Sequence, residues 1–367
     1  MDRAGPGWVN RVTGSESVVR RPGPGSGPRG APTAIALSPI LSARYRSRDL
    51  ERIRGAASGA RIVMVSVEGL ADGPVDDVEV MLRGWLSSEA FDRLLARAPR
   101  LTWVHSATSG VERALTPAAR ERGLVVTNAR GVFSGPIAEY VLMMILAVSR
   151  RLPQLLELQR ERTWQPLEGA ELRDVTVGIV GLGSIGRAVA SLASSFGCRV
   201  VAVRRHSGLE PAPRGTHDEA QAASELQLDR VGGPETLDEL LGESDFIVLA
   251  APLTPETEEM INAETLARVK PGAWLINVAR GRLIDERALL RALRDGELGG
   301  AVLDTFRDEP LSPASPFYDL PNVIVTPHTA WSSGRVLDRS VDLFCENLRR
   351  FAGGESLLNV VDPDAGY

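Results

Sequence analysis

The chain has 367 residues, a formal net charge of −5 and a hydrophobic fraction of 43%. This length is enough for two compact domains of ordinary size. The slight acidic excess argues against a nucleic acid or an anionic membrane surface as partner, because no surplus of cations is available to neutralise phosphates. The most apolar run, 140–148, is much shorter than the roughly 20 residues that a membrane span needs, so we expect no membrane insertion.

The cysteines and histidines indicate neither a metal site nor a disulfide framework. The two cysteines lie far apart in the sequence, and the four histidines show no metal-ligand spacing. A chain without a disulfide framework fits a reducing compartment. We therefore expect no bound metal and a cytoplasmic location.

The first part of the chain divides into an extension and an α/β series. Residues 1–32 are rich in Gly, Pro, Ser and Arg, and such a segment buries too little apolar surface to offset its ordering entropy, so we predict disorder. From residue 33, strand-like runs alternate with helical patterns, which predicts a parallel sheet covered by helices. The predicted strands are 62–67, 78–82, 101–104 and 124–127, and the predicted helices are 88–97 and 137–149, the latter opened by Pro136.

A second and clearer α/β series begins near residue 175. Its predicted strands are 175–180, 199–203, 246–250, 273–278, 301–303 and 322–326. The sequence thus predicts two doubly wound α/β domains. One comprises 33–148 plus 333–361, because the last stretch reads as helical and is too short to fold alone. The other comprises 149–332.

A glycine-rich turn follows the first strand of the second series. Gly181, Gly183 and Gly186 form a GxGxxG motif between an apolar strand and a helical pattern, which is the context that a dinucleotide site requires. Gly181 would allow the turn, Gly183 the approach of a diphosphate, and Gly186 close helix–strand packing. The helix N-terminus, with the N–H groups of Ser184 and Ile185, would face the phosphates. The alternative is an incidental tight turn.

The next strand ends with arginines instead of a carboxylate. An Asp or Glu at this position accepts hydrogen bonds from the ribose hydroxyls of NAD, whereas this chain has Arg204 and Arg205, followed by Ser207. Paired guanidinium groups bind a 2′-phosphate well. The pattern favours NADP(H), with NAD(H) possible if the arginines are merely solvated at the strand end.

Three further segments follow strands of the second series and together supply the parts for reducing a keto acid. Arg280 suits a substrate carboxylate and the carbonyl beside it, because its planar fork matches a carboxylate. His328 suits proton donation to the developing alkoxide. Glu309 would favour the protonated imidazole and fix its orientation. Each residue alone has an ordinary structural explanation.

Taken in order, these motifs resemble the D-2-hydroxyacid dehydrogenase family, in particular its glyoxylate/hydroxypyruvate reductase-like branch. The motifs are 181–186, 277–281, Asp304 with Glu309-Pro310, and Pro327-His328, and the resemblance covers roughly 35–360. It implies a Rossmann nucleotide-binding domain, a flavodoxin-like substrate domain and an active cleft between them. It also implies a small 2-keto or 2-hydroxy acid as substrate, and a homodimer to which helix 137–149 and Trp164 contribute.

The same resemblance implies roles for other residues. Arg280 would bind the substrate carboxylate and carbonyl, His328 would be the general acid/base with Glu309 as partner, and Asp304 would lie beside the nicotinamide. Further expected cofactor contacts are Ala251, Pro252, Leu253, Thr257, Val278 and Ala279. Further expected substrate contacts are Thr108, Ser109 and Gly110 of the loop 106–111, together with Arg83 and Trp331. The alternative for the loop 106–111 is an ordinary Ser/Gly turn without a ligand. The alternative for Trp331 is packing at a subunit interface.

Two other functions remain open from the sequence. One is a nicotinamide-sensing binding module without activity, similar to the corepressor proteins that resemble this family. The other is a dehydrogenase of a different small anion, such as phosphite. The acid's side chain is not fixed by these motifs.

Overall fold

The computed structural model describes residues 29–40, 45–205 and 228–363, which divide into two compact units. One unit comprises 29–40, 45–133 and 333–363, and the other comprises 134–205 and 228–332. Most of the predicted disordered extension and the predicted cofactor contact Ser207 lie outside the described residues. The boundary that the sequence placed at 148 falls at 133, because helix α4 (Ser134–Ser149) packs against helix α6 (Ser184–Ser195) of the second unit.

The unit that contains 45–133 is built on a parallel five-stranded sheet of order β2-β1-β3-β4-β5. This is the flavodoxin-like order, which confirms the predicted fold class of this part of the chain. The strands are β1 (Ala34–Leu37), β2 (Arg61–Met64), β3 (Val78–Arg83), β4 (Trp103–Ser106) and β5 (Val125–Thr127). The sequence patterns missed β1 and placed the other four within a few residues.

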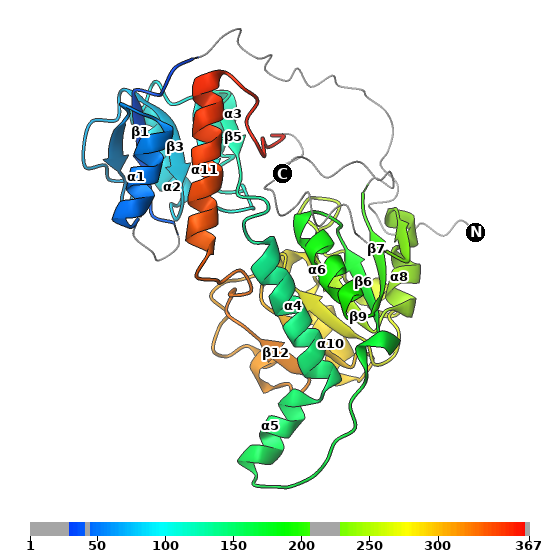
Figure 1. Ribbon diagram of the computed structural model, residues 1–367. Helices are drawn as coiled ribbons and strands as arrows, with labels where there is room; N and C mark the ends of the chain where they lie inside the picture. The colour runs from blue at the N-terminus through cyan, green and yellow to red at the C-terminus, as the bar shows by residue number, and fades with distance from the viewer. Residues whose placement is uncertain (1–28, 41–44, 206–227, 364–367) are drawn as a thin grey trace. The chain divides into compact units, whose positions relative to one another are not determined.

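Alternate residues of β1 enter two different cores on the two faces of this sheet. Ile35 and Leu37 pack with Phe344 of α11 (Val336–Gly353), whereas Ala34 and Ala36 pack with Phe91 of α2 (Ser88–Arg97). Figure 1 shows α11 in red beside the blue helix α1 (Ser47–Ala56), with which it is in contact. A short helix, α3 (Pro117–Glu121), packs against α2. The segment after 333 therefore completes the fold of residues far earlier in the chain.

The second unit is built on a parallel seven-stranded sheet of order β12-β11-β10-β9-β6-β7-β8. The strands are β6 (Thr176–Val180), β7 (Arg199–Val203), β8 (Arg230–Gly232), β9 (Phe246–Leu249), β10 (Trp274–Asn277), β11 (Gly300–Leu303) and β12 (Val323–Val325). The chain turns from β6 to β7 on one side and later places β9 on the other side of β6. This reversal is the switch point at which open α/β sheets bind ligands.

Besides α4 and α6, the helices of this unit are α5 (Leu152–Arg160), α8 (Leu237–Glu243), α9 (Ala263–Leu266) and α10 (Glu286–Arg294). Helix α5 contacts α4 and has no buried residue. Short 3₁₀ turns are η1 (Leu172–Asp174), η2 (Pro234–Thr236), η3 (Gly281–Leu283) and η4 (Pro316–Asp319). Pro136 is the third residue of α4 instead of the first, which is tolerated because the first-turn N–H groups of a helix have no intrahelical partner.

Candidate active site

The glycine-rich turn has the geometry of a diphosphate site at the carboxyl end of β6. Gly181 has φ +102°, and a Cβ there would lie 2.6 Å from the Ala251 nitrogen, so only glycine fits. A Cβ at Gly186 would lie 2.1 Å from the Gly181 oxygen, which explains the close helix–strand packing. Gly183 differs, because its Cβ would meet nothing within 4 Å and α6 begins at the following residue, Ser184. The open space in front of the helix N-terminus fits phosphate oxygens.

The arginines that follow β7 lie at the neighbouring strand end. The backbone N–H of Arg204 donates to the Gly232 oxygen at 3.0 Å, which ties it to the end of β8. Its guanidinium Nη1 is buried and has no hydrogen-bond partner in the part of the chain that the structure describes. A buried, unsatisfied guanidinium nitrogen at this end of the sheet fits an anionic ligand group. Arg205 is exposed.

The segment after β9 packs against the glycine-rich turn. Ala251 is buried against Gly181, and Pro252 is exposed. The hydroxyl of Thr257 accepts the Thr254 N–H at 2.8 Å and donates to the Pro252 oxygen at 2.7 Å. Thr257 therefore fixes the shape of the loop on which the predicted contacts lie.

Arg280 is held by a side-chain clamp at the end of β10. The Asn277 amide accepts the Ala279 N–H at 3.0 Å and donates to the Arg280 oxygen at 2.9 Å. Both Val278 and Ala279 are buried, whereas Arg280 is half-buried and its Nη1 donates to the Ala279 oxygen at 2.8 Å. The sequence motif contained Asn277, but its role as the clamp of this turn becomes visible only in the structure.

Glu309 and His328 form the predicted pair. The His328 Nδ1 lies 2.7 Å from the Glu309 Oε2, and the Glu309 Oε1 accepts the Phe306 N–H at 3.0 Å. Because a carboxylate accepts here, Nδ1 carries the proton and Nε2 is available as the reacting nitrogen. Burial acts to raise the pKa of Glu309, but the hydrogen bonds from His328 and Phe306 outweigh it, with Arg280 contributing, and the net pKa is lowered. Glu309 is thus held as an ionised partner for the imidazole.

Asp304 is buried beneath the turn that carries His328. Its Oδ1 accepts from the Thr326 hydroxyl at 2.6 Å and from the Thr329 N–H at 2.8 Å, and its Oδ2 accepts the Ala330 N–H at 3.0 Å. The carboxylate therefore organises the 326–330 turn. The contact with the nicotinamide that the resemblance implied stays a prediction.

Of the predicted substrate contacts, Thr108, Ser109 and Gly110 lie together in the loop after β4. The Thr108 hydroxyl donates to the Gly110 oxygen at 2.7 Å, and the Asn128 amide donates to the Ser109 oxygen at 3.0 Å. These bonds fix the loop through its oxygens. Within the described residues, the Ser109 and Gly110 N–H groups donate to no protein atom and suit an anion.

Arg83, at the end of β3, is buried. Its Nη2 donates to the Leu86 oxygen at 2.5 Å and its guanidinium lies over the Phe91 ring at 5.3 Å. Burial, assisted by the charge of Arg113, lowers its pKa to about 10. These contacts give it a packing role, and its contact with substrate stays a prediction. Trp331 is partly buried.

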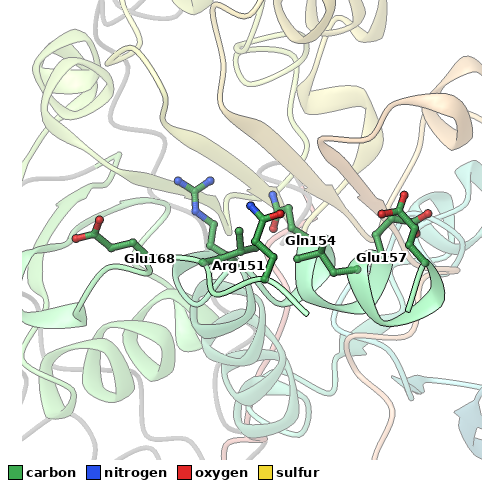
Figure 2. A pocket seen from close by; sticks show the side chains of 8 residues that line it. Arg151, Gln154, Glu157 and Glu168 are labelled. Carbon is green, nitrogen blue, oxygen red and sulfur yellow. The ribbon is translucent and has the colours of Figure 1, made fainter. Parts of the chain in front are cut away.

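A separate hollow lies beside α5, in the second unit. Figure 2 shows that it is lined by side chains such as Arg151, Gln154, Glu157 and Glu168. None of the predicted site residues lines it. Within the ranges that the structure describes, no cluster of His, Cys, Asp or Glu has the arrangement of a metal site, and no helix is both long and apolar enough to span a membrane.

A doubly wound sheet with a glycine-rich turn and an Arg–Glu–His set at its strand ends is typical of nicotinamide-dependent oxidoreductases. Residues 142–330 match the family model described as D-isomer specific 2-hydroxyacid dehydrogenase, NAD binding domain. The chain is 34% identical over 298 residues to a glyoxylate reductase of Korarchaeum cryptofilum, and the match covers 79% of this chain and 83% of that protein. The chain belongs to the D-2-hydroxyacid dehydrogenase family, as its sequence motifs predicted.

Further relatives show how broad this family is. The chain is 37% identical over 275 residues to the D-3-phosphoglycerate dehydrogenase of Mycobacterium tuberculosis. The match covers 74% of this chain and 49% of that protein, so the chain spans about half the length of this relative. A 2-hydroxyacid dehydrogenase from Xanthobacter autotrophicus Py2, solved with NADPH and MES, is similar with a TM-score of 0.77 and 30% identity over 92% of this chain and 100% of that one. An NADPH-dependent glyoxylate/hydroxypyruvate reductase from Sinorhizobium meliloti, solved with NADP and sulfate, has a TM-score of 0.74 and 28% identity over 91% of this chain and 100% of that one.

Proposed function

We propose that the protein reduces a small 2-keto acid, such as glyoxylate or hydroxypyruvate, to the D-2-hydroxy acid with NADP(H). The observation that carries this proposal is the 2.7 Å hydrogen bond between His328 Nδ1 and Glu309 Oε2. Arg280 and the glycine-rich turn 181–186 lie in the same unit. The relatives support the substrate class, since the chain covers 83% of a glyoxylate reductase but 49% of a phosphoglycerate dehydrogenase.

The proposed mechanism assigns one task to each residue of the set. NADPH, when bound, supplies the hydride for the keto carbon. Arg280 binds the substrate carboxylate bidentately and stabilises negative charge that develops on the carbonyl oxygen. Protonated His328 gives its Nε2 proton to that oxygen, while Glu309 keeps Nδ1–H aligned and stabilises the imidazolium before transfer.

The preference for NADP(H) is proposed from Arg204 and Arg205. The buried, unsatisfied Nη1 of Arg204 supports a role in binding the 2′-phosphate. Two similar structures were solved with NADPH or NADP, which supports the same cofactor. A carboxylate at either position would repel the phosphate.

The test is a comparison of NADPH and NADH oxidation with glyoxylate, hydroxypyruvate, phosphohydroxypyruvate, pyruvate and phenylpyruvate. We expect NADPH-selective reduction of glyoxylate or hydroxypyruvate. Selectivity for NADH would refute the role of the arginines and leave the chemistry intact. NADPH binding without turnover of any acid would favour a binding module, and NADP reduction by phosphite would favour an anion dehydrogenase.

We also propose a homodimer that uses α4 and α5. An apolar groove lies along these helices and is lined by the exposed side chains of Met143 and Leu155, among others. Leu156 of α5 and Trp164 are also exposed and add apolar surface to this part of the chain. Light scattering should give a molar mass of about twice the chain mass of 39.5 kDa. The Leu156→Glu variant should have the mass of a single chain. The matched control is Leu70→Glu, an exposed leucine of the other unit, which should leave the mass unchanged.

A further inference from the structure

A tyrosine outside the predicted site is hydrogen-bonded to the segment that carries His328. The Tyr140 hydroxyl of α4 lies 2.6 Å from the Thr326 hydroxyl at the end of β12. Thr326 in turn lies 2.6 Å from the Asp304 Oδ1 at the end of β11. Three separate elements therefore meet in one chain of hydrogen bonds, and no motif in the sequence marks Tyr140 as a member.

The donor in each of these hydrogen bonds follows from the protons available. Asp304 Oδ1 already accepts the Thr329 N–H, so it acts as an acceptor and Thr326 donates its single hydroxyl proton to it. Thr326 can then only accept from Tyr140, which must be the donor. Burial raises the pKa of Tyr140 to about 12, against the opposing effect of the Thr326 hydrogen bond, so the phenol keeps this proton near neutral pH.

Asp304, the last residue in this series of hydrogen bonds, holds His328 in an unfavourable backbone conformation. His328 has φ +50°, a left-handed backbone conformation that is unfavourable for a residue other than glycine and persists only where the surrounding structure imposes it. The constraint comes from Asp304, whose backbone oxygen accepts the His328 N–H at 2.9 Å and whose carboxylate binds Thr326, Thr329 and Ala330 around it. A side chain that orients Thr326 therefore acts on the backbone of His328.

We propose that Tyr140 is a positioning residue that, through Thr326 and Asp304, fixes the turn on which His328 meets Glu309. Its hydroxyl is bonded to Thr326 and not to Glu309 or Arg280, so its effect is on the alignment of His328 and not on substrate affinity. The catalytic consequence rests on the proposed function, whereas the structural consequence for His328 does not.

The kinetic test removes the phenol hydroxyl alone. We expect Tyr140→Phe to lower kcat about tenfold while KM for the keto acid stays within about twofold, since sub-ångström misplacement of a reacting group is costly and Arg280 is untouched. The matched control is Tyr45→Phe, which removes a hydroxyl that donates to the Ser38 oxygen at 2.8 Å in the other unit. It should leave kcat unchanged. An unchanged kcat in Tyr140→Phe would overturn the proposal.

Variants at Thr326 test whether Tyr140 acts through the Thr326 hydroxyl. Thr326→Ser keeps the hydroxyl and should retain turnover. Thr326→Val should lower kcat more than Tyr140→Phe does, because the Asp304 carboxylate then loses its hydroxyl donor and keeps only the Thr329 and Ala330 N–H groups. In the Thr326→Val background, Tyr140→Phe should have no further effect on kcat, since the residue through which it acts is gone. Additive losses would overturn the proposed connection.

A readout that does not need turnover separates this proposal from the proposed function. The Nδ1–H of His328 is bound to Glu309 but partly exposed, so its low-field proton resonance should be recorded at low temperature, where exchange with solvent is slow, and identified by its loss in His328→Asn. We expect the resonance to persist in Tyr45→Phe and to broaden or vanish in Tyr140→Phe. Persistence in Tyr140→Phe would overturn the positioning role. Loss there in a protein that reduces no acid would uphold that role and refute the proposed function.

Discussion

Gly281 offers a severe test of the site geometry, because it separates Arg280 from the segment that leads to Glu309. A Cβ at this position would lie 1.9 Å from the Phe306 carbonyl carbon and 2.3 Å from the Arg307 nitrogen. Both neighbours are backbone atoms, so no side-chain rotation can relieve the contact. Gly281→Ala must therefore move one backbone segment away from the other.

The size of this movement gives the expected loss. Carbon atoms in contact are about 3.5 Å apart or more, so the segments have to separate by about 1.5 Å. A displacement of about 1 Å at a reacting group can cost about 100-fold in rate, and this one separates Arg280 from Glu309 and His328. We expect kcat/KM to fall about 100-fold or more, and the free energy of unfolding to fall by about 1–3 kcal/mol, as for other overpacked sites.

The assay is steady-state reduction of the preferred keto acid, with NADPH affinity measured by fluorescence titration and stability by urea unfolding. Gly242→Ala in α8 is the matched control, since its Cβ would meet an ordinary contact at 3.5 Å. It should keep full activity and gain helix stability. A Gly281→Ala variant with kcat/KM within twofold of wild type would refute the assignment of Arg280 and Glu309 to one site.

The remaining predictions concern individual side chains of the site. His328→Ala should lower kcat by about 10²–10⁴-fold with little change in NADPH affinity, the range expected for loss of a general acid; steady-state kinetics with a cofactor titration checks this. Arg280→Ala should raise KM and lower kcat together, because binding and charge stabilisation are lost at once. Arg204→Glu should shift the ratio of kcat/KM values from NADPH towards NADH, and an unchanged ratio would contradict its role. For Glu309, whose folded pKa is lowered, ionisation stabilises the fold above the ordinary glutamate range, and this stability disappears as the pH falls through the folded pKa. The difference in unfolding free energy between wild type and Glu309→Gln should therefore be largest near neutral pH and vanish in acid.

The part of the site that follows strand ends was predictable from the sequence. In a parallel sheet the carboxyl ends of strands meet at one edge, so Gly181, Arg280 and His328 could be brought together from strand patterns alone. The glycine motif also carries its own geometry, because the positive φ of Gly181 and the close packing at Gly181 and Gly186 leave no alternative residue there. Contiguous motifs and strand ends are thus the features that local patterns describe well.

The parts that were not predictable depend on packing between distant elements. The short strands β1 and β8 give weak patterns, and the unit to which α4 belongs is decided by its packing on α6. The burial of Arg83 under Phe91 depends on how α2 lies on the sheet. The contact of Tyr140 with Thr326 joins residues 186 positions apart, and no residue type or spacing announces it.

The most direct test of the account follows a labelled hydride from the cofactor to the product. Hydroxypyruvate would be reduced with NADPH that carries deuterium at C4 of the nicotinamide in the transferable position, and the product analysed by mass spectrometry and chiral chromatography. The account predicts D-glycerate with one deuterium at C2, formed by wild type and formed about 10²–10⁴-fold more slowly by His328→Ala. Product without deuterium at C2, or of the L configuration, would contradict it.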